Sequence, residues 1–336
     1  MWRAGRPTCH TRLGCVMGSA PVSGRELDAA GITDPGLRAA YEECRRLNSS
    51  HGRTYYLSTL LLPAAKRPHV HALYGFARYA DELVDDLDSP DPAELVRWGD
   101  RFLADLADDH DGTAAHVDHP VSRAAVHTAR TWGIPTETFV AFLESMRMDI
   151  TVTGYPTYAD LEHYMYGSAA VIGLQMVPIL EPLPGREQEA TDRAQALGEA
   201  FQLSNFIRDV AEDLRRGRVY LPQEDLDRFG VTRADLAPGS TPPHVVELLR
   251  FEIARTRALY AAARPGIELL HPTSRDCIRT AFALYGGILE AVEKADYQVL
   301  DRRVAVPLPR RLAVALPGLV RARRARRGRP RTLRPA

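Results

Sequence analysis

The stretch QLSNFIRDVAED, residues 202–213, governs how the rest of this 336-residue chain is interpreted. Spacings of three, four and four residues place one row of amide and carboxylate groups on a single helical face: Gln202, Asn205, Asp209 and Asp213. The other faces are apolar, which is typical of a buried helix. A buried carboxylate without a partner is costly, so this row should face cations. A solvated polar face is the alternative that one helix alone leaves open.

A second acidic helix is expected within YGFARYADELVDD, residues 74–86. Asp81 and Asp85 are one turn apart, and Tyr74 and Arg78 extend the same face backwards. Two carboxylates about 4 Å apart repel each other by up to about 4 kcal/mol at an effective dielectric near 20. Mg²⁺ would relieve that repulsion, because it binds carboxylate oxygens and keeps other positions for water and phosphate. Two such helices facing each other across a cavity, with arginines beside them, indicate diphosphate chemistry.

Composition favours a cytoplasmic protein over a membrane-spanning, secreted or nucleic-acid-binding one. A hydrophobic content of 45% is ample for a core, and no apolar run reaches the roughly 18 residues that a membrane span needs. The N-terminus lacks the apolar core of a signal peptide, and the four cysteines lack metal-binding spacing, which favours reduced thiols. Net charge is zero, yet ten arginines and no acid follow from Arg310 onward, so residues 1–309 carry −10. An acidic body makes nucleic-acid binding a poor interpretation.

Helical spacing interrupted by Pro and Gly predicts one all-α domain of roughly ten to twelve helices. One helix should begin at Pro68 and carry Asp81, and the others are expected over residues 35–47, 54–62, 92–109, 120–132, 135–150, 158–180, 187–216, 243–270 and 274–300. Small residues on the 158–180 helix predict close approach of either a packed helix or a slender ligand. Residues 1–33 are expected to form a poorly ordered lead, with Met17 as an alternative start, and 34–309 the domain. The arginine-rich tail, 310–336, could lie on an anionic membrane surface or remain solvated.

Beyond the two acidic faces, residues 35–310 resemble the phytoene/squalene synthase family. The resemblance is carried by HGRTYY (51–56), YGFARYADELVDD (74–86), YMYGSAAVIG (164–173) and QLSNFIRDVAEDLRRGRVYLP (202–222). The wording DELVD and its context are most similar to bacterial phytoene synthases. The resemblance implies the all-α isoprenoid synthase helical bundle, with a central cavity between the two aspartate helices.

The resemblance also implies roles for individual residues. The implied ligands of Mg²⁺, or of Mn²⁺ in its place, are Asp81, Asp85, Asn205, Asp209 and Asp213. The implied contacts to diphosphate or to the prenyl heads are His51, Arg53, Thr54, Tyr74, Arg78, Gln202, Arg208, Arg218, Tyr285 and Arg303. The implied catalytic residues are Tyr164, Tyr220, Tyr285 and Arg78. Relatives commonly carry lysine at the position of Arg53, so a compact ammonium is replaced here by a planar guanidinium. The pair Gly286-Gly287 is also unusual for the family.

The activity implied is head-to-head (1'-1) condensation of two geranylgeranyl diphosphates through prephytoene diphosphate to phytoene, with no nicotinamide. The closest alternative is squalene, dehydrosqualene or hydroxysqualene synthesis from C15 farnesyl diphosphate, of which squalene formation needs a nicotinamide reductant. A terpene cyclase would carry N-D-x-x-S-x-x-x-E on its later helix, which this chain does not match. A helical interaction scaffold is the non-enzymatic alternative. The enzyme is expected in the cytoplasm, with peripheral contact to anionic membrane.

Overall fold

The computed structural model describes residues 22–85, 91–108, 114 and 116–327, except for the side chains at positions 22, 23, 53 and 85. Within these residues the regular structure is helical, apart from two isolated β-bridges, so the all-α prediction is confirmed. The helices are α1 (Val22–Ala29), α2 (Pro35–His51), α3 (Arg53–Thr59), α4 (Arg67–Asp85), α5 (Pro92–Ala107), α6 (Pro120–Trp132), α7 (Thr136–Met148), α8 (Tyr158–Met165), η1 (Tyr166–Ala170), α9 (Val171–Leu180), α10 (Glu187–Arg215), α11 (Gln223–Arg228), η2 (Arg233–Leu236), α12 (Pro243–Ala263), η3 (Arg264–Leu269), α13 (Pro272–Lys294) and α14 (Leu308–Arg327).

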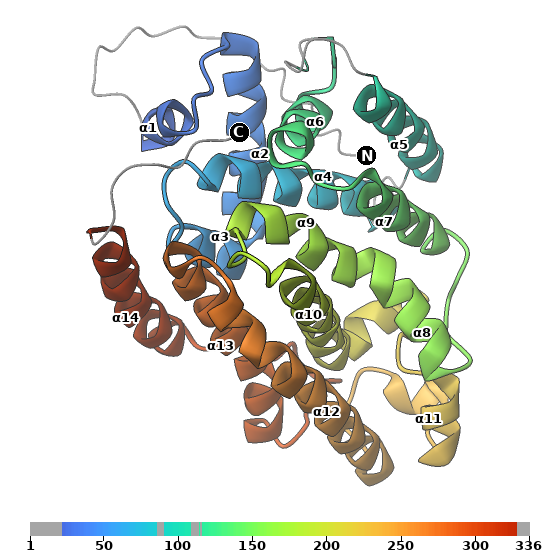
Figure 1. Ribbon diagram of the computed structural model, residues 1–336. Coiled ribbons are helices and arrows are strands. Elements are labelled where there is room, and N and C mark those ends of the chain that lie inside the picture. The colour runs from blue at the N-terminus through green and yellow to red at the C-terminus, as the bar shows by residue number, and fades with distance from the viewer. Residues whose placement is uncertain (1–21, 86–90, 109–113, 115, 328–336) are drawn as a thin grey trace, which may run out of the picture.

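Helix α10 is the axis of the molecule (Figure 1). It is 29 residues long and packs against α9, η1, α12, η3 and α13. At 1.5 Å per residue it spans roughly 44 Å. Its first turn carries Glu187 and Glu189, whose charges suit the positive end of the helix dipole. A helix surrounded in this way can present a row of polar side chains to the interior, as its sequence predicts.

Local sequence signals set the ends of several helices. The side chain of Asp34 accepts a hydrogen bond from the backbone N–H of Leu37 at 2.7 Å, and Pro35 occupies the first turn of α2. Helix α6 begins at a proline and ends before Gly133, whose φ of 59° is the left-handed conformation that glycine adopts readily. The bounds of α6 are therefore those expected from the sequence.

Two large hydrophobic clusters lie on either side of the centre. One joins α2, α4, α5, α6 and α7 and includes the fully buried Phe76 and Trp98. The other joins α10, α12 and α13 around Ile207, Leu249 and Leu289. Apolar contacts of this kind hold α4 and α10 at fixed positions. The two helices that carry the acidic rows are thus each anchored in a separate part of the core.

The segment expected as one helix over 158–180 consists of α8, the π-helical turn η1 and α9. A β-carbon at Gly173 would lie 2.5 Å from the carbonyl oxygen of Ala194, and one at Gly198 would lie 2.5 Å from that of Ala169. These glycines therefore permit close packing of α9 and η1 against α10. Gly173 and Ala169 also line a cavity, so the approach of a slender ligand at these positions stays a prediction.

Two segments differ from what the sequence predicts. Helix α1 lies within the segment expected to be a poorly ordered lead. Its Glu26 forms an ion pair with Arg67 at 2.6 Å, and the Glu26 side chain is only 6% exposed. Helix α14 forms most of the expected tail and packs along α13. Both helices depend on tertiary contacts, which explains why local sequence patterns did not reveal them. Residues 1–21 and 328–336 lie outside the described part of the chain.

Candidate active site

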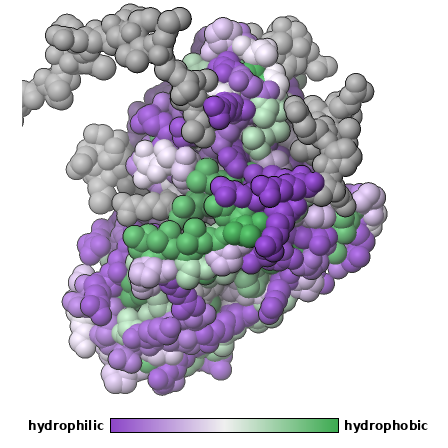
Figure 2. Space-filling model, turned by 90° about the vertical axis from the view of Figure 1, so that its left-hand side faces the viewer, coloured by the Kyte–Doolittle hydropathy of each residue, from purple (hydrophilic) through white to green (hydrophobic). Residues whose placement is uncertain are grey.

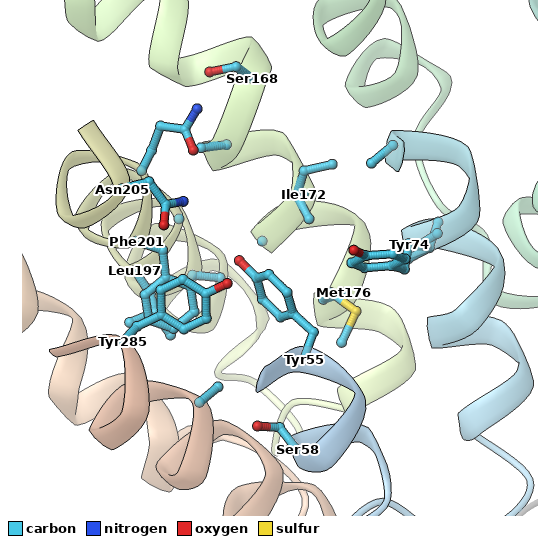
Figure 3. A pocket seen from close by; sticks show the side chains of 18 of the residues that line it. Tyr55, Ser58, Tyr74, Ser168, Ile172, Met176, Leu197, Phe201, Asn205 and Tyr285 are labelled. Atoms are coloured by element: carbon cyan, nitrogen blue, oxygen red, sulfur yellow. The ribbon is translucent and has the colours of Figure 1, made fainter. Parts of the chain in front are cut away.

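A cavity of about 980 Å³ is enclosed by side chains from α3, α4, η1, α9, α10 and α13 (Figure 3). Along α10 its wall is formed by Ala190, Leu197 and Phe201, and then by Asn205 and Asp209. The rise of an α-helix places the last of these residues roughly 29 Å from the first. The cavity is therefore long, apolar at one end and acidic at the other. Its volume is at the upper end of the range of about 300–1,000 Å³ for small-molecule sites.

The structure brings the two acidic rows together: Asp81 of α4 and Asp209 of α10 line this same cavity. The other predicted site residues that line it are His51, Tyr74, Arg78, Tyr164, Gln202, Asn205, Arg208, Asp213, Tyr220, Tyr285 and Arg303.

Four predicted site residues stand apart from this set. Thr54 does not line the cavity, and its backbone carbonyl accepts a hydrogen bond from Ser58 Oγ at 3.1 Å within α3. Arg218 does not line it either, because its Nη2 donates to the backbone carbonyl of Asp149 at 2.9 Å. The side chains of Arg53 and Asp85 lie outside the described part of the structure. The phosphate contact expected of Arg218 stays a prediction.

Arg78 neutralises the acidic end of α4. Its Nη1 lies 2.6 Å from Asp81 Oδ2, and its Nε lies 2.9 Å from Glu82 Oε1. His51 Nε2 approaches the same Glu82 oxygen at 3.8 Å. Glu82 also lines the cavity, beside Asp81.

Asp209 is paired with two arginines, Arg208 and Arg303. Arg208 Nε donates to its Oδ1 at 2.8 Å, while Arg303 donates from Nε to Oδ1 at 2.8 Å and from Nη2 to Oδ2 at 3.0 Å. Burial acts to raise the pKa of Asp209, but hydrogen bonds and charge from Arg208 and Arg303 outweigh it and hold the pKa below its usual range. Burial likewise opposes the charge of Arg208, and Asp209 more than compensates, raising the pKa of that guanidinium. This end of the cavity therefore holds fixed charges of both signs.

Aromatic rings form the wall next to the charged end. Figure 3 shows Tyr55, Tyr74 and Tyr285 directed into one space from three different helices. The Tyr55 ring centroid lies 4.9 Å from that of Tyr285 and 6.1 Å from that of Tyr74, and Phe201 stacks on Tyr285 at 4.4 Å. Burial raises the pKa of both Tyr55 and Tyr285, so these phenols stay neutral. Neutral ring faces can stabilise a cation by about 0.5–2 kcal/mol each.

A second polar group is centred on Asp149, at the C-terminus of α7. The Tyr164 hydroxyl donates to its Oδ2 at 2.7 Å, and the Tyr220 hydroxyl donates to its Oδ1 at 3.1 Å. Burial, followed by the charge of Asp149, raises the pKa of Tyr164 well above its ordinary value. The rings of Tyr164 and Tyr220 stack at 5.6 Å, and Phe206 covers Tyr220 at 4.1 Å. A carboxylate that holds two tyrosine hydroxyls at the cavity wall can receive a proton through either of them.

Sequence reasoning missed Tyr55, Phe201 and Asp149. Tyr55 lies inside the motif HGRTYY. In that motif the resemblance implied substrate contacts for His51, Arg53 and Thr54 but none for Tyr55. Phe201 precedes the polar row of α10, and the sequence alone does not distinguish a cavity wall from core packing at this position. No sequence signal could have identified Asp149, because it is a single carboxylate with no partner at helical spacing.

The part of the chain that builds this cavity lies almost wholly within a match to a known protein family. Residues 49–310 match the family model described as Squalene/phytoene synthase. The chain is 36% identical over 280 residues to a phytoene synthase of Arthrospira platensis, covering 80% of this chain and 88% of that protein. It is also 36% identical over 291 residues to a 15-cis-phytoene synthase of Synechocystis, covering 82% and 83% of the two chains. The chain therefore belongs to the squalene/phytoene synthase family.

Solved structures agree with this assignment. A dehydrosqualene synthase crystal structure superposes with a TM-score of 0.75 at 28% identity and covers 87% of this chain and 98% of its own. A squalene synthase of Alicyclobacillus acidocaldarius superposes with a TM-score of 0.68, also at 28% identity, over 80% of this chain and 98% of that one. The prediction of an isoprenoid synthase bundle is therefore confirmed. So is the resemblance to bacterial phytoene synthases, because the cyanobacterial relatives carry that name.

Proposed function

We propose that the protein joins two C20 geranylgeranyl diphosphates head to head, through prephytoene diphosphate, to give phytoene and diphosphate. The observation that carries this proposal is one long cavity with acidic helices and arginines at one end and an apolar wall beyond them. A diphosphate suits the first end and a prenyl chain suits the second. Phytoene synthases are also the relatives with 36% identity over most of the chain. We place the catalytic domain within residues 34–309.

The donor set at the acidic end fits magnesium. Asp81, Asn205, Asp209 and Asp213 supply oxygen atoms around the same space. No three His, Cys, Asp or Glu side chains of the described residues converge into one ready-made metal site. Mg²⁺ does not need such a cage, because it is usually held by one or two carboxylates together with substrate phosphates. When bound, Mg²⁺ or Mn²⁺ would neutralise negative charge that develops on the departing diphosphate.

The arginines position the diphosphate. Arg78, Arg208 and Arg303 each present a planar fork beside a carboxylate of the acidic end. A guanidinium recognises phosphate in the same bidentate manner as it recognises carboxylate, so these side chains can turn from one to the other. They thereby stabilise charge on the leaving group before and after the bond to carbon breaks.

The aromatic wall protects the cationic carbon that ionisation leaves behind. Water would capture such a cation, so the reacting carbons must lie in an apolar environment. Tyr55, Phe201 and Tyr285 supply that environment and offer ring faces to the cation. The remaining wall, from α9 and the first half of α10, holds the prenyl chain.

Proton loss completes each stage, and Tyr164 is the residue that we assign to it. Its hydroxyl oxygen accepts the proton released from carbon, while its own proton passes to Asp149 along the 2.7 Å hydrogen bond. Because burial raises the pKa of Tyr164, the phenol works as a relay and does not ionise beforehand. Tyr220 and Arg218 keep Asp149 in place through a hydroxyl bond and a backbone bond.

Product analysis tests the proposed function. The pure protein is incubated with Mg²⁺ and either C20 or C15 diphosphate, with and without NADPH. We expect phytoene from the C20 substrate without reductant. Squalene that forms from the C15 substrate only in the presence of NADPH would assign the enzyme to the alternative reaction, and dehydrosqualene without NADPH would do so as well.

The hydrocarbon product implies a site of release. Phytoene carries no polar group, so it partitions into a lipid bilayer and not into water. No helix in the described ranges has both the length and the apolar character to cross a bilayer. The basic segment 310–336 is attracted by anionic lipid. We therefore place the enzyme in the cytoplasm, in peripheral contact with an anionic membrane.

A further inference from the structure

Helix α14 exposes an apolar stripe to solvent. Its members are spaced by four residues and are between 43% and 63% exposed: Leu308, Leu312, Leu316 and Val320. Residues four apart lie on one helical face. The opposite face is also packed, because Gly318 and Ala322 are buried against the body of the protein. An α-helix with one apolar face buried and a second one exposed has a surface left for a partner.

Arginines continue the stripe at its C-terminal end. Arg323 and Arg327 follow Val320 at spacings of three and seven, which places them on the same exposed side. These two and Arg324 are exposed and form no ion pair within the part of the chain that the structure describes. By contrast, Arg321 lies 2.7 Å from Asp276 of α13 and so helps to fix the helix. No acidic residue occurs between Arg302 and the end of the chain. The exposed arginines of α14 therefore cannot pair with a carboxylate side chain of that segment.

Figure 2 faces the side of the molecule on which α14 lies and shows a hydrophobic patch bordered by hydrophilic residues. We propose that the α14 stripe, with Arg323, Arg324 and Arg327, docks flat on an anionic lipid bilayer. A basic helix with an apolar face is suited to the boundary between headgroups and acyl chains. A second copy of the chain, docked through the same surface, would cover the leucines. It would also place its own arginines beside these arginines and supply no acidic side chain from this segment to pair with them. An anionic bilayer supplies both the apolar layer and the negative charge.

The position of α13 connects this surface with the cavity. Cys277, Ile278 and Ala281 of α13 line the cavity. On its other side, α13 carries Asp276, which pairs with Arg321, and Thr280, which touches Gly318 of α14. Packed helix axes lie about 8–10 Å apart, so α13 and α14 together separate the cavity from the docked surface. If the proposed function is correct, docking on α14 brings the cavity within two helices of the bilayer that receives the hydrocarbon.

Sedimentation with liposomes tests the docking surface in the full-length protein. The variant Leu312→Glu/Leu316→Glu should lower partitioning into phosphatidylglycerol-rich vesicles by more than about tenfold for each leucine. Arg323→Ser should lower it by roughly fivefold, and neither variant should bind better to phosphatidylcholine alone. Val96→Glu and Arg101→Ser, both on α5, are the matched controls, because both positions are exposed and α5 packs on α4, α6 and α7. Turnover in detergent checks that every variant is folded.

Two further readouts separate the alternatives. In the Leu316→Trp variant, the fluorescence of the introduced tryptophan should shift to shorter wavelength when anionic vesicles are added. Lipids with brominated acyl chains should quench this fluorescence. Unchanged liposome binding of the double variant would overturn the proposal. So would a wild-type dimer that the double variant converts to a monomer without any binding to vesicles. Docking without phytoene formation would refute the proposed function and leave the docking surface standing.

Discussion

The guanidinium of Arg303 forms a bidentate pair with the carboxylate of Asp209, although 94 residues separate them in the chain. Arg303 lies in the segment between α13 and α14, and Asp209 lies near the C-terminal end of α10. The arginine is 57% exposed on its side chain, whereas the aspartate is only 13% exposed. An exposed side chain that covers a buried acid can leave it when another anion or cation arrives. The pair therefore connects the loop after α13 with the acidic end of the cavity.

Arg303→Gln should weaken the use of the diphosphate substrate while leaving the protein folded. A hydrogen bond to a charged group contributes about 1.5–3 kcal/mol, so kcat/KM should fall by roughly ten- to a hundredfold. The Arg303→Lys variant should retain only part of the wild-type kcat/KM, because an ammonium cannot bind in a bidentate manner. The neighbouring Arg302→Gln is the control, since it removes an exposed arginine that makes no ion pair among the described residues. Equal losses for both glutamines would refute a specific role of Arg303.

Asp81→Asn and Asp209→Asn should each abolish nearly all turnover. Under the proposed function each variant loses an oxygen ligand for Mg²⁺, which removes transition-state stabilisation of about 4 kcal/mol, or roughly a thousandfold in rate. Asp192→Asn is the control, because Asp192 is exposed on the same α10. Steady-state kinetics over a Mg²⁺ titration, with circular dichroism for folding, provide the measurement. A helical scaffold without activity predicts that neither substitution changes product formation.

Periodicity explains how much of this site was accessible from sequence. The spacing of Gln202, Asn205 and Asp209 defines one face of a helix whatever surrounds it, and the same holds for Asp81 on α4. Apolar residues on the remaining faces required both helices to be buried. From those two facts it followed that the acidic rows meet in the interior.

Features that depend on three-dimensional contact were not accessible. The Arg303–Asp209 pair joins a loop to a helix, and Asp149 approaches Tyr164 and Tyr220 only because three separate segments meet. Helix α14 has the composition of a solvated tail, yet it packs on α13 where Gly318 allows it. A β-carbon there would lie 2.9 Å from Thr280 Oγ1. Such fits between backbones leave no periodic trace.

Asp149→Asn should lower kcat by about 10²–10⁴-fold and change KM little, because the amide keeps the shape but cannot accept the proton. Tyr164→Phe should have a similar effect, and the double variant should be no worse than either single one, since both act in one relay. Tyr155→Phe is the control. Its ring lies 5.2 Å from that of Tyr164, and its hydroxyl is buried without a hydrogen-bond partner in the described structure. A raised KM with an unchanged kcat in Asp149→Asn would show a role in binding.

Glu252 on α12 should make the free energy of unfolding depend on pH. Its side chain is fully buried and lies 2.9 Å from Arg255, which also pairs with Asp225 at 2.7 Å. Burial raises the pKa of Glu252 to about 7, with Arg255 opposing and Asp225 adding to the shift. An unfolded glutamate has a pKa of about 4.3, so the folded form retains the proton longer. The contribution to stability is full below about pH 4.3 and is lost as pH rises through about 7.

Glu252→Gln should remove that dependence, because the amide cannot ionise. Relative to wild type, the variant should gain roughly 2–3 kcal/mol between about pH 5 and about pH 8, measured by urea unfolding at both values. Glu247→Gln on the same helix is the control, since its carboxylate is 57% exposed and should not alter the slope. Parallel curves for wild type and Glu252→Gln would mean that Glu252 is already ionised near pH 5. Arg255 would then hold the charge of Glu252 more strongly than burial opposes it.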